Sequence, residues 1–214
     1  MPGCNHKTDH DTFQGMSADY KRRLWLVIFI NAGMFAVEIT GGHLAQSKAL
    51  FADSLDFLAD SLTYGLSLYV IGMGIRARTR AALFKGFSLL AMGLWVFGST
   101  AYAFFTNTLP DAQWMGEIGL LALLANVASV LILATYKDGD ANVRSVWLCS
   151  RNDAIGNVAV IIAAVAVWLT ASRWPDLIVA ALMAGLFLTS AWQILRQGLE
   201  EYNGMRAYEN RCNE

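Results

Sequence analysis

The chain has 214 residues, of which 56% are hydrophobic and 15% are charged, and its formal net charge is −1. Soluble domains carry about 25% charged residues, so this composition excludes an ordinary soluble domain. Because apolar runs of about 20 residues or more recur along the chain, the sequence predicts an all-α integral membrane protein. The three cysteines do not suggest a disulfide framework, since two lie near the ends and one lies inside an apolar run.

The first segment, residues 1–20, is polar and is predicted to be a tail rather than a signal peptide. Cys4, His6 and His10 in this segment offer loose ligands for a metal ion. A disordered tail with chance ligands explains the same residues. The first apolar run begins only at Leu24 and is too long for the hydrophobic region of a signal peptide, so we expect it to stay as a membrane anchor.

Six apolar segments follow, and each is predicted to be a membrane-spanning helix. Their approximate bounds are 24–44, 49–75, 83–105, 115–136, 145–170 and 176–195. Lysine and arginine gather in the N-terminal tail, the second-to-third loop at 76–82, the fourth-to-fifth loop and the C-terminal tail, whereas the other loops carry only Lys48 and Arg173. The positive-inside rule therefore predicts that both termini are cytosolic. We expect the membrane domain to cover 21–197 and a short cytosolic tail to cover 198–214.

The second apolar segment contains three carboxylates, Asp53, Asp56 and Asp60. On a helix, the spacing i, i+3, i+7 places all three on one face, with Asp56 and Asp60 one turn apart. Each charge inside a membrane costs about 2.5–3.5 kcal/mol, so three cost roughly 8–10 kcal/mol, and a divalent cation is a natural partner for them. The alternative is an outside loop with a helix that begins at Ser61. It leaves 15 residues to cross the membrane, fewer than the about 20 required.

The fifth apolar segment offers a second pair of ligands, Cys149 and Asp153, with the same spacing of four residues. Asn157 lies one further turn along the same face. Two helices that each carry such a pair can build a four-coordinate site, and zinc accepts mixed sulfur and oxygen ligands while cadmium is favoured by sulfur. The alternative for Cys149 is a small buried hydrophobic residue without a role in binding.

Taken together, these segments resemble the cation diffusion facilitators, a family that exports divalent metals in exchange for protons. The resemblance covers residues 24–197 and rests on the following motifs: Asn31 and Val37–Gly42; Ser47–Asp53 and Asp56–Asp60; Asn142–Arg144 and Asp153–Asn157; Pro175–Asp176 and Ser190–Trp192. It implies a transport site on helices two and five, formed by Asp56, Asp60, Cys149 and Asp153. Cys149 is a departure, since most members have His at that position.

The resemblance implies proton-coupled export of zinc, and also of cadmium, across the inner membrane by alternating access around this site. Iron, manganese or cobalt is the alternative substrate. Asp53, Glu38 and Asn157 are expected to be accessory residues, the first two as proton relays. Members usually carry a cytosolic domain after helix six, whereas about 17 residues follow Gln197 here, so we expect no C-terminal domain.

We expect a homodimer formed through membrane helices, with small residues such as Gly86 and Gly93 on the third span as possible contacts. The metal ion, protons and the bilayer are the expected partners, without nucleic acid, enzymatic activity or a cofactor other than the transported Zn²⁺ or Cd²⁺. Two other classes of membrane protein are alternatives. An intramembrane aspartyl protease would need a Gly-rich Asp motif, and none surrounds Asp60 or Asp153. A metal-binding sensor or scaffold without transport is compatible with the sequence.

Overall fold

The computed structural model describes residues 17–70, 73, 75–106, 108–136 and 141–212, so Cys4, His6 and His10 lie outside the described residues. The elements are α1 (Ala18–Ala45), α2 (Lys48–Val70), α3 (Ile75–Phe105), α4 (Ala112–Leu133), the short 3₁₀ helix η2 (Ala134–Tyr136), α5 (Ala141–Thr170) and α6 (Trp174–Cys212). Across the described residues there are helices and turns and no strand, which confirms the predicted all-α class.

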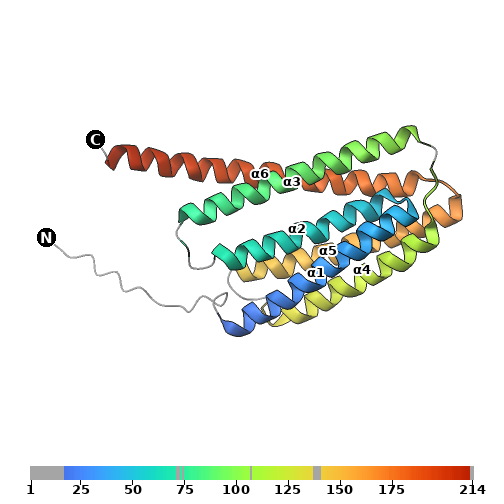
Figure 1. The fold of residues 1–214 in the computed structure, drawn as a ribbon, viewed down its shortest axis with the longest axis horizontal. Helices are drawn as coiled ribbons and strands as arrows, with labels where there is room; N and C mark the ends of the chain where they lie inside the picture. The colour runs from blue at the N-terminus through green and yellow to red at the C-terminus, as the bar shows by residue number, and fades with distance from the viewer. Residues whose placement is uncertain (1–16, 71–72, 74, 107, 137–140, 213–214) are drawn as a thin grey trace.

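The helices lie along one common axis, and α1 begins at the same end of the bundle at which α6 ends (Figure 1). The main neighbours are α1 with α2, α3 with α6, and α4 with α5. Helix α2 contacts each of the other five α-helices, so it is the central helix of the bundle. We call the end at which α1 begins the basic end, because Lys21, Arg22, Arg23, Arg76 and Arg78 all lie near it on α1 and α3.

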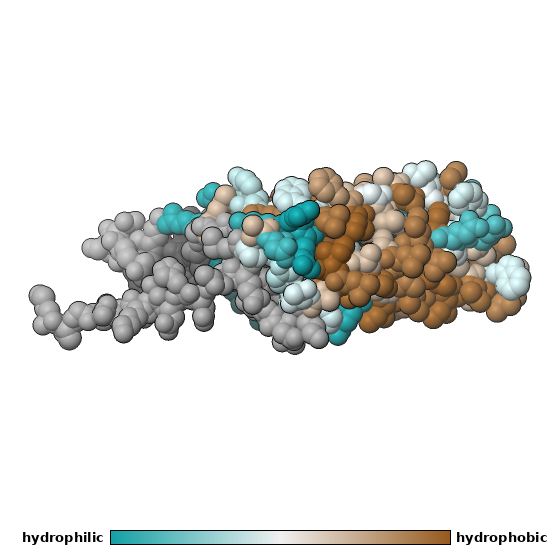
Figure 2. Space-filling model, turned by 90° about the horizontal axis from the view of Figure 1, so that it is seen from below, coloured by the Kyte–Doolittle hydropathy of each residue, from teal (hydrophilic) through white to brown (hydrophobic). Residues whose placement is uncertain are grey.

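Five of the described helices are long and apolar enough to cross a membrane, namely α1, α3, α4, α5 and α6. Figure 2 shows hydrophobic residues covering much of the visible bundle surface, with hydrophilic patches towards either end. Large apolar side chains point outwards over this surface; among them are Trp25, Phe29, Leu131, Trp168 and Leu186. Such a surface needs a lipid environment, so this is a multi-pass membrane protein. Helix α2 is not among the five, and its 23 residues include three aspartates and Lys48.

The predicted loop between the second and third spans is wrong in position. Helix α2 ends at Val70 rather than near residue 75, and α3 already begins at Ile75, so residues 76–82 are helical. The physical reason is that this stretch consists mainly of arginine and alanine, which are strong helix formers, and contains neither glycine nor proline. Lys85 lies well inside α3 and is half-buried.

Helix α6 extends beyond the predicted sixth span, because it continues to Cys212. Pairs of side chains one turn apart, Arg196 with Glu200 and Gln197 with Glu201, bond along the polar half of this helix. Such i, i+4 pairs support a helix that leaves the apolar layer. At the other end of α6, Pro175 lies in the first helical turn, where a missing N–H costs nothing, rather than in the preceding turn.

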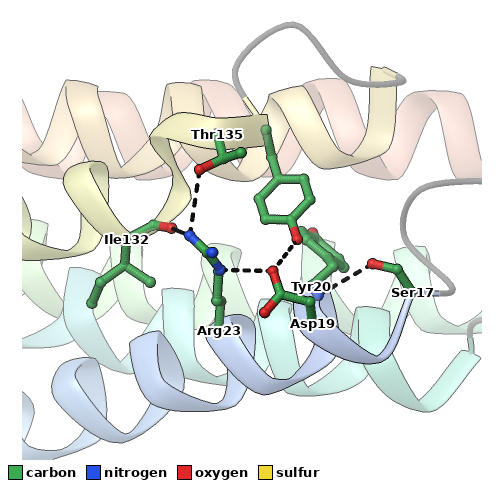
Figure 3. A network of polar contacts seen from close by, with 7 residues as sticks. Ser17, Asp19, Tyr20, Arg23, Ile132 and Thr135 are labelled. Atoms are coloured by element: carbon green, nitrogen blue, oxygen red, sulfur yellow. Dashed lines mark hydrogen bonds and ion pairs between the residues drawn. The ribbon is translucent and has the colours of Figure 1, made fainter.

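A polar network at the basic end joins the start of α1 to the end of α4 (Figure 3). The Arg23 guanidinium donates to the carbonyl oxygen of Ile132 at 3.1 Å and to Asp19 Oδ2 at 2.9 Å. The Tyr136 hydroxyl donates to the same Asp19 oxygen at 2.7 Å. The Ser17 hydroxyl oxygen caps α1 by accepting from the Tyr20 N–H. The network fixes the crossing of α1 and α4 at this end.

The small residues of α3 pack within the chain. A side chain at Gly86 would meet Leu195 at 2.8 Å, and one at Gly93 would meet Leu188 at 2.9 Å, and both of these leucines are on α6. The two glycines therefore allow α3 and α6 to approach closely. They are covered by α6, which leaves the expected homodimer without support from these positions.

Candidate functional site

The three aspartates of α2 lie on a continuous helix. Asp53 is buried, with 2% of its surface exposed, while Asp56 and Asp60 are half-buried. Because α2 runs without interruption from Lys48 to Val70, the alternative of an outside loop followed by a helix at Ser61 is excluded. The bundle places α2 at its centre, so the aspartates are directed at other helices. The sequence periodicity predicted this common face correctly.

Helix α5 brings Asp153 to the same place. Its half-buried side chain interacts with the carboxyl groups of both Asp56 and Asp60. Cys149, one turn earlier on α5, is half-buried, has a free thiol and interacts with Asp60 and Asp56. Asn157, one turn later, is fully buried, and neither of its amide atoms has a hydrogen-bond partner. The structure thus brings together the four predicted ligands from two helices.

A second acid pair lies beside the first. Glu38 of α1 is completely buried and interacts with Asp53 of α2, which lies one turn before Asp56. No donor reaches either oxygen of Glu38 or the Oδ2 atom of Asp53. Two buried carboxyl groups without a donor between them are stable side by side only when a proton or a cation is shared. This arrangement suits the expected accessory role of both residues.

The acids do not form a complete coordination sphere for a metal ion. Over the described part of the chain, no group of three or more His, Cys, Asp or Glu side chains is placed to hold a metal ion. Asp56, Asp60, Cys149 and Asp153 share one region, and their assignment as ligands stays a prediction.

Two apolar clusters enclose this region along the bundle axis. The basic-end cluster consists of Tyr20, Leu24, Val27, Ile28, Tyr64, Leu133 and Val146. The far-end cluster consists of Ala45, Ala49, Leu50, Met115, Ile118, Val160, Ala163, Ala164 and Val167. Along α2 the aspartates come after Leu50 and before Tyr64, and along α5 Asp153 comes after Val146 and before Val160. The acids therefore lie between two layers of apolar side chains.

Sequence reasoning missed two residues that interact with the site. Tyr64, on α2, donates a hydrogen bond from its hydroxyl to Asp60 Oδ2 at 2.5 Å. Lys85, on α3, interacts electrostatically with Asp60 and Cys149. Tyr64 continues the four-residue spacing of Asp56 and Asp60, which is a signal that the sequence carried. Lys85 had no such signal, because it is on α3 and no spacing along the chain relates it to the acids of α2 and α5.

Comparison with known proteins gives the class. Residues 24–201 match the model of the cation efflux transmembrane domain, so the chain belongs to the cation efflux family. This confirms the resemblance drawn from the motifs of the first, second, fifth and sixth segments. The family membership agrees with the five apolar helices and with acids that meet inside the bundle.

Individual relatives have low sequence identity to this chain. The zinc transporter ZitB of Escherichia coli is 27% identical over 209 residues, which cover 92% of this chain and 67% of the relative. The metal cation efflux system protein CzcD of Cupriavidus metallidurans is 24% identical, with 92% and 64% covered. A cadmium, cobalt and zinc/H(+)-K(+) antiporter of Bacillus subtilis is 22% identical, with 83% and 62% covered. The chain thus spans about two thirds of the length of these relatives.

Proposed function

We propose that this protein exports divalent metal cations, with zinc as the main substrate and cadmium as a further one, in exchange for protons. The observation that carries the proposal is the meeting of Asp56 and Asp60 of α2 with Asp153 of α5 between two apolar clusters. Three acids enclosed in this way need positive charge, and a divalent cation or protons supply it. The relatives named as zinc and cadmium transporters support the choice of metal.

The proposed binding step uses the ligands Asp56, Asp60, Asp153 and Cys149. Ligands must lose their protons before they bind a cation, so metal binding releases protons from these groups. When the metal leaves, the carboxyl groups take up protons again, which links export of the metal to import of protons. The thiol of Cys149 favours zinc and cadmium over manganese, while the three carboxylates alone would also suit manganese or iron. The adjoining pair of Glu38 and Asp53 is proposed to relay protons, and Asn157 to support Asp153.

The proposed topology has six membrane spans. Helix α2 has 23 residues, which at about 1.5 Å per residue gives roughly 35 Å, enough for a hydrocarbon core of about 30 Å. Six spans put the start of α1 and the end of α6 on one side, as Figure 1 shows for the bundle. The arginine and lysine residues at the basic end support a cytosolic position for that side, and the proposed membrane is the inner membrane.

The two clusters support a proposal of alternating access. The basic-end cluster separates the acids from the cytosol, and the far-end cluster separates them from the outside. Opening one cluster at a time exposes the site to one side while the other side stays sealed. The metal enters through the basic-end cluster and leaves through the far-end cluster. We further propose a homodimer, on the strength of the family resemblance alone.

The test is metal flux into sealed inverted vesicles that contain a pH dye. Zinc, cadmium and manganese are compared for the wild type, Asp60→Asn and Cys149→Ser, with Glu117→Gln as a matched control because Glu117 is exposed on α4. We expect zinc and cadmium uptake with matching proton efflux. Asp60→Asn abolishes this uptake, Cys149→Ser weakens it, and Glu117→Gln leaves it unchanged.

The other outcomes separate the alternatives. Manganese uptake that does not depend on Cys149 would support the transporter function but indicate a metal site with oxygen ligands only. Tight zinc binding without flux or proton movement would favour a sensor or scaffold. Zinc transport of normal rate by Asp60→Asn would overturn the ligand assignment.

A further inference from the structure

Among the described residues, Tyr64 is the one that donates a hydrogen bond to a carboxylate of the proposed metal site. Its hydroxyl lies 2.5 Å from Asp60 Oδ2, and the tyrosine is 1% exposed. The same side chain interacts with Cys149 and Asp153 on α5. Its hydroxyl group is therefore placed where the ligands of the two helices meet.

The ring of Tyr64 has a different set of neighbours. It belongs to the basic-end cluster, together with apolar residues of α1, α4 and α5, and Cys149 and Trp147 pack against the same cluster. One side chain thus has its polar end on a proposed ligand and its apolar body in the layer that separates the site from the basic end. Asp56 and Asp153, by contrast, receive no hydrogen bond from a tyrosine, serine or threonine among the described residues.

We propose that Tyr64 is a positioning residue of the metal site, which orients the Asp60 carboxylate towards α5 and ties it to the basic-end cluster. The inference rests on the proposed function and deepens it. With Oδ2 engaged by the tyrosine, Oδ1 is left to face the cation. A ligand held in this way binds a metal more tightly than a freely rotating one, and removal of such a partner costs about 10- to 100-fold in metal affinity.

The chain provides a matched control for the loss of a phenolic hydroxyl. Tyr136 also donates to an aspartate, Asp19 Oδ2 at 2.7 Å, and its ring packs against Tyr20 of the same basic-end cluster. Asp19 lies at the start of α1 and is not a proposed ligand. Tyr136→Phe therefore repeats the chemical change of Tyr64→Phe away from the site.

The experiment measures zinc binding by equilibrium dialysis of the full chain in detergent, and KM and Vmax of zinc uptake in vesicles. The variants are Tyr64→Phe, Tyr136→Phe, Asp60→Asn and the double variant Asp60→Asn/Tyr64→Phe. We expect Tyr64→Phe to weaken zinc binding by about 10-fold or more and to raise KM by a similar factor, with a smaller change in Vmax. Tyr136→Phe binds zinc as the wild type does. In the Asp60→Asn background, Tyr64→Phe changes the residual binding by less than about twofold, because the carboxylate ligand that the hydroxyl positions is gone.

Three results would overturn the inference. Wild-type zinc affinity in Tyr64→Phe would show that the hydrogen bond does not position the ligand. An equal loss in the wild-type and Asp60→Asn backgrounds would assign Tyr64 a general structural role. If the wild type itself bound neither zinc nor cadmium, the proposed function would fail and the inference with it. If the wild type binds zinc and Asp60→Asn binds it weakly, the proposed function stands, whatever the zinc affinity of Tyr64→Phe.

Discussion

The substitution Asp176→Asn tests how α6 holds the start of α2. Asp176, in the first turn of α6, is 1% exposed and lies against the N-terminus of α2. Its Oδ1 atom accepts from the Ser47 hydroxyl at 2.6 Å and from the Ala49 N–H at 3.0 Å, and its Oδ2 atom accepts from the Lys48 N–H at 2.9 Å. A carboxylate from another helix therefore caps the helix that carries the proposed ligands.

The expected loss of stability follows from the hydrogen bonds that asparagine cannot make. An amide has one acceptor oxygen, so if that oxygen keeps the bonds of Oδ1, the Lys48 N–H faces an NH₂ donor instead of an acceptor. A hydrogen bond to a charged group contributes about 1.5–3 kcal/mol, and the lost negative charge at a helix N-terminus adds about 0.3–1 kcal/mol. We expect Asp176→Asn to lower the free energy of unfolding by about 2–4 kcal/mol, which for a chain of this size lowers Tm by about 5–15 °C.

The assay is thermal unfolding of the purified full chain in detergent, followed by circular dichroism. Asp111→Asn is the matched control, since Asp111 caps α4 by accepting from the N–H groups of Gln113 and Trp114 but is exposed. Asparagine is as good an N-cap as aspartate at such a position, so Tm stays within about 1–2 °C of the wild type. Equal Tm values for the wild type and Asp176→Asn would refute the reasoning, because they would show that the three bonds do not hold α2 to α6.

Two further substitutions concern helix packing and the basic end. Gly42→Ala is expected to lower Tm, because a Cβ atom there would lie 3.1 Å from the backbone nitrogen of Phe51. Gly33→Ala on the same helix is the control: its Cβ atom meets nothing within 4 Å, so the better helix propensity of alanine should raise Tm. Equal behaviour of the two variants in thermal unfolding would contradict the close approach of α1 and α2. Arg23→Gln should cost about 1 kcal/mol, since Arg23 loses its bonds to Ile132 and Asp19 at a partly exposed position, and 1 M salt should reduce the difference. If Arg23→Gln lowered Tm more than Asp176→Asn, the basic-end network would contribute more to stability than about 1 kcal/mol.

The membrane class and the ligand helices followed from local patterns. Long apolar runs need helices in a bilayer, and the four-residue spacing within Asp56–Asp60 and within Cys149–Asp153 places each pair on one helix face whatever the rest of the chain does. For the same reason the family could be recognised from short motifs. The loop at 76–82 could not be placed in this way, because hydropathy marks the edge of the apolar layer rather than the end of a helix. A run of arginine and alanine continues a helix into water.

The sequence by itself determined the apolar spans, the acids on α2 and α5, and the charge difference between the two ends of the bundle. Only the tertiary structure decided which side chains meet. Glu38 of α1 lies beside Asp53 of α2, and Asp176 of α6 caps the start of α2, so each pair joins two helices. The physical reason is that periodicity fixes the direction of a side chain relative to its own helix, whereas its partner depends on which helices pack together and at what height along the axis.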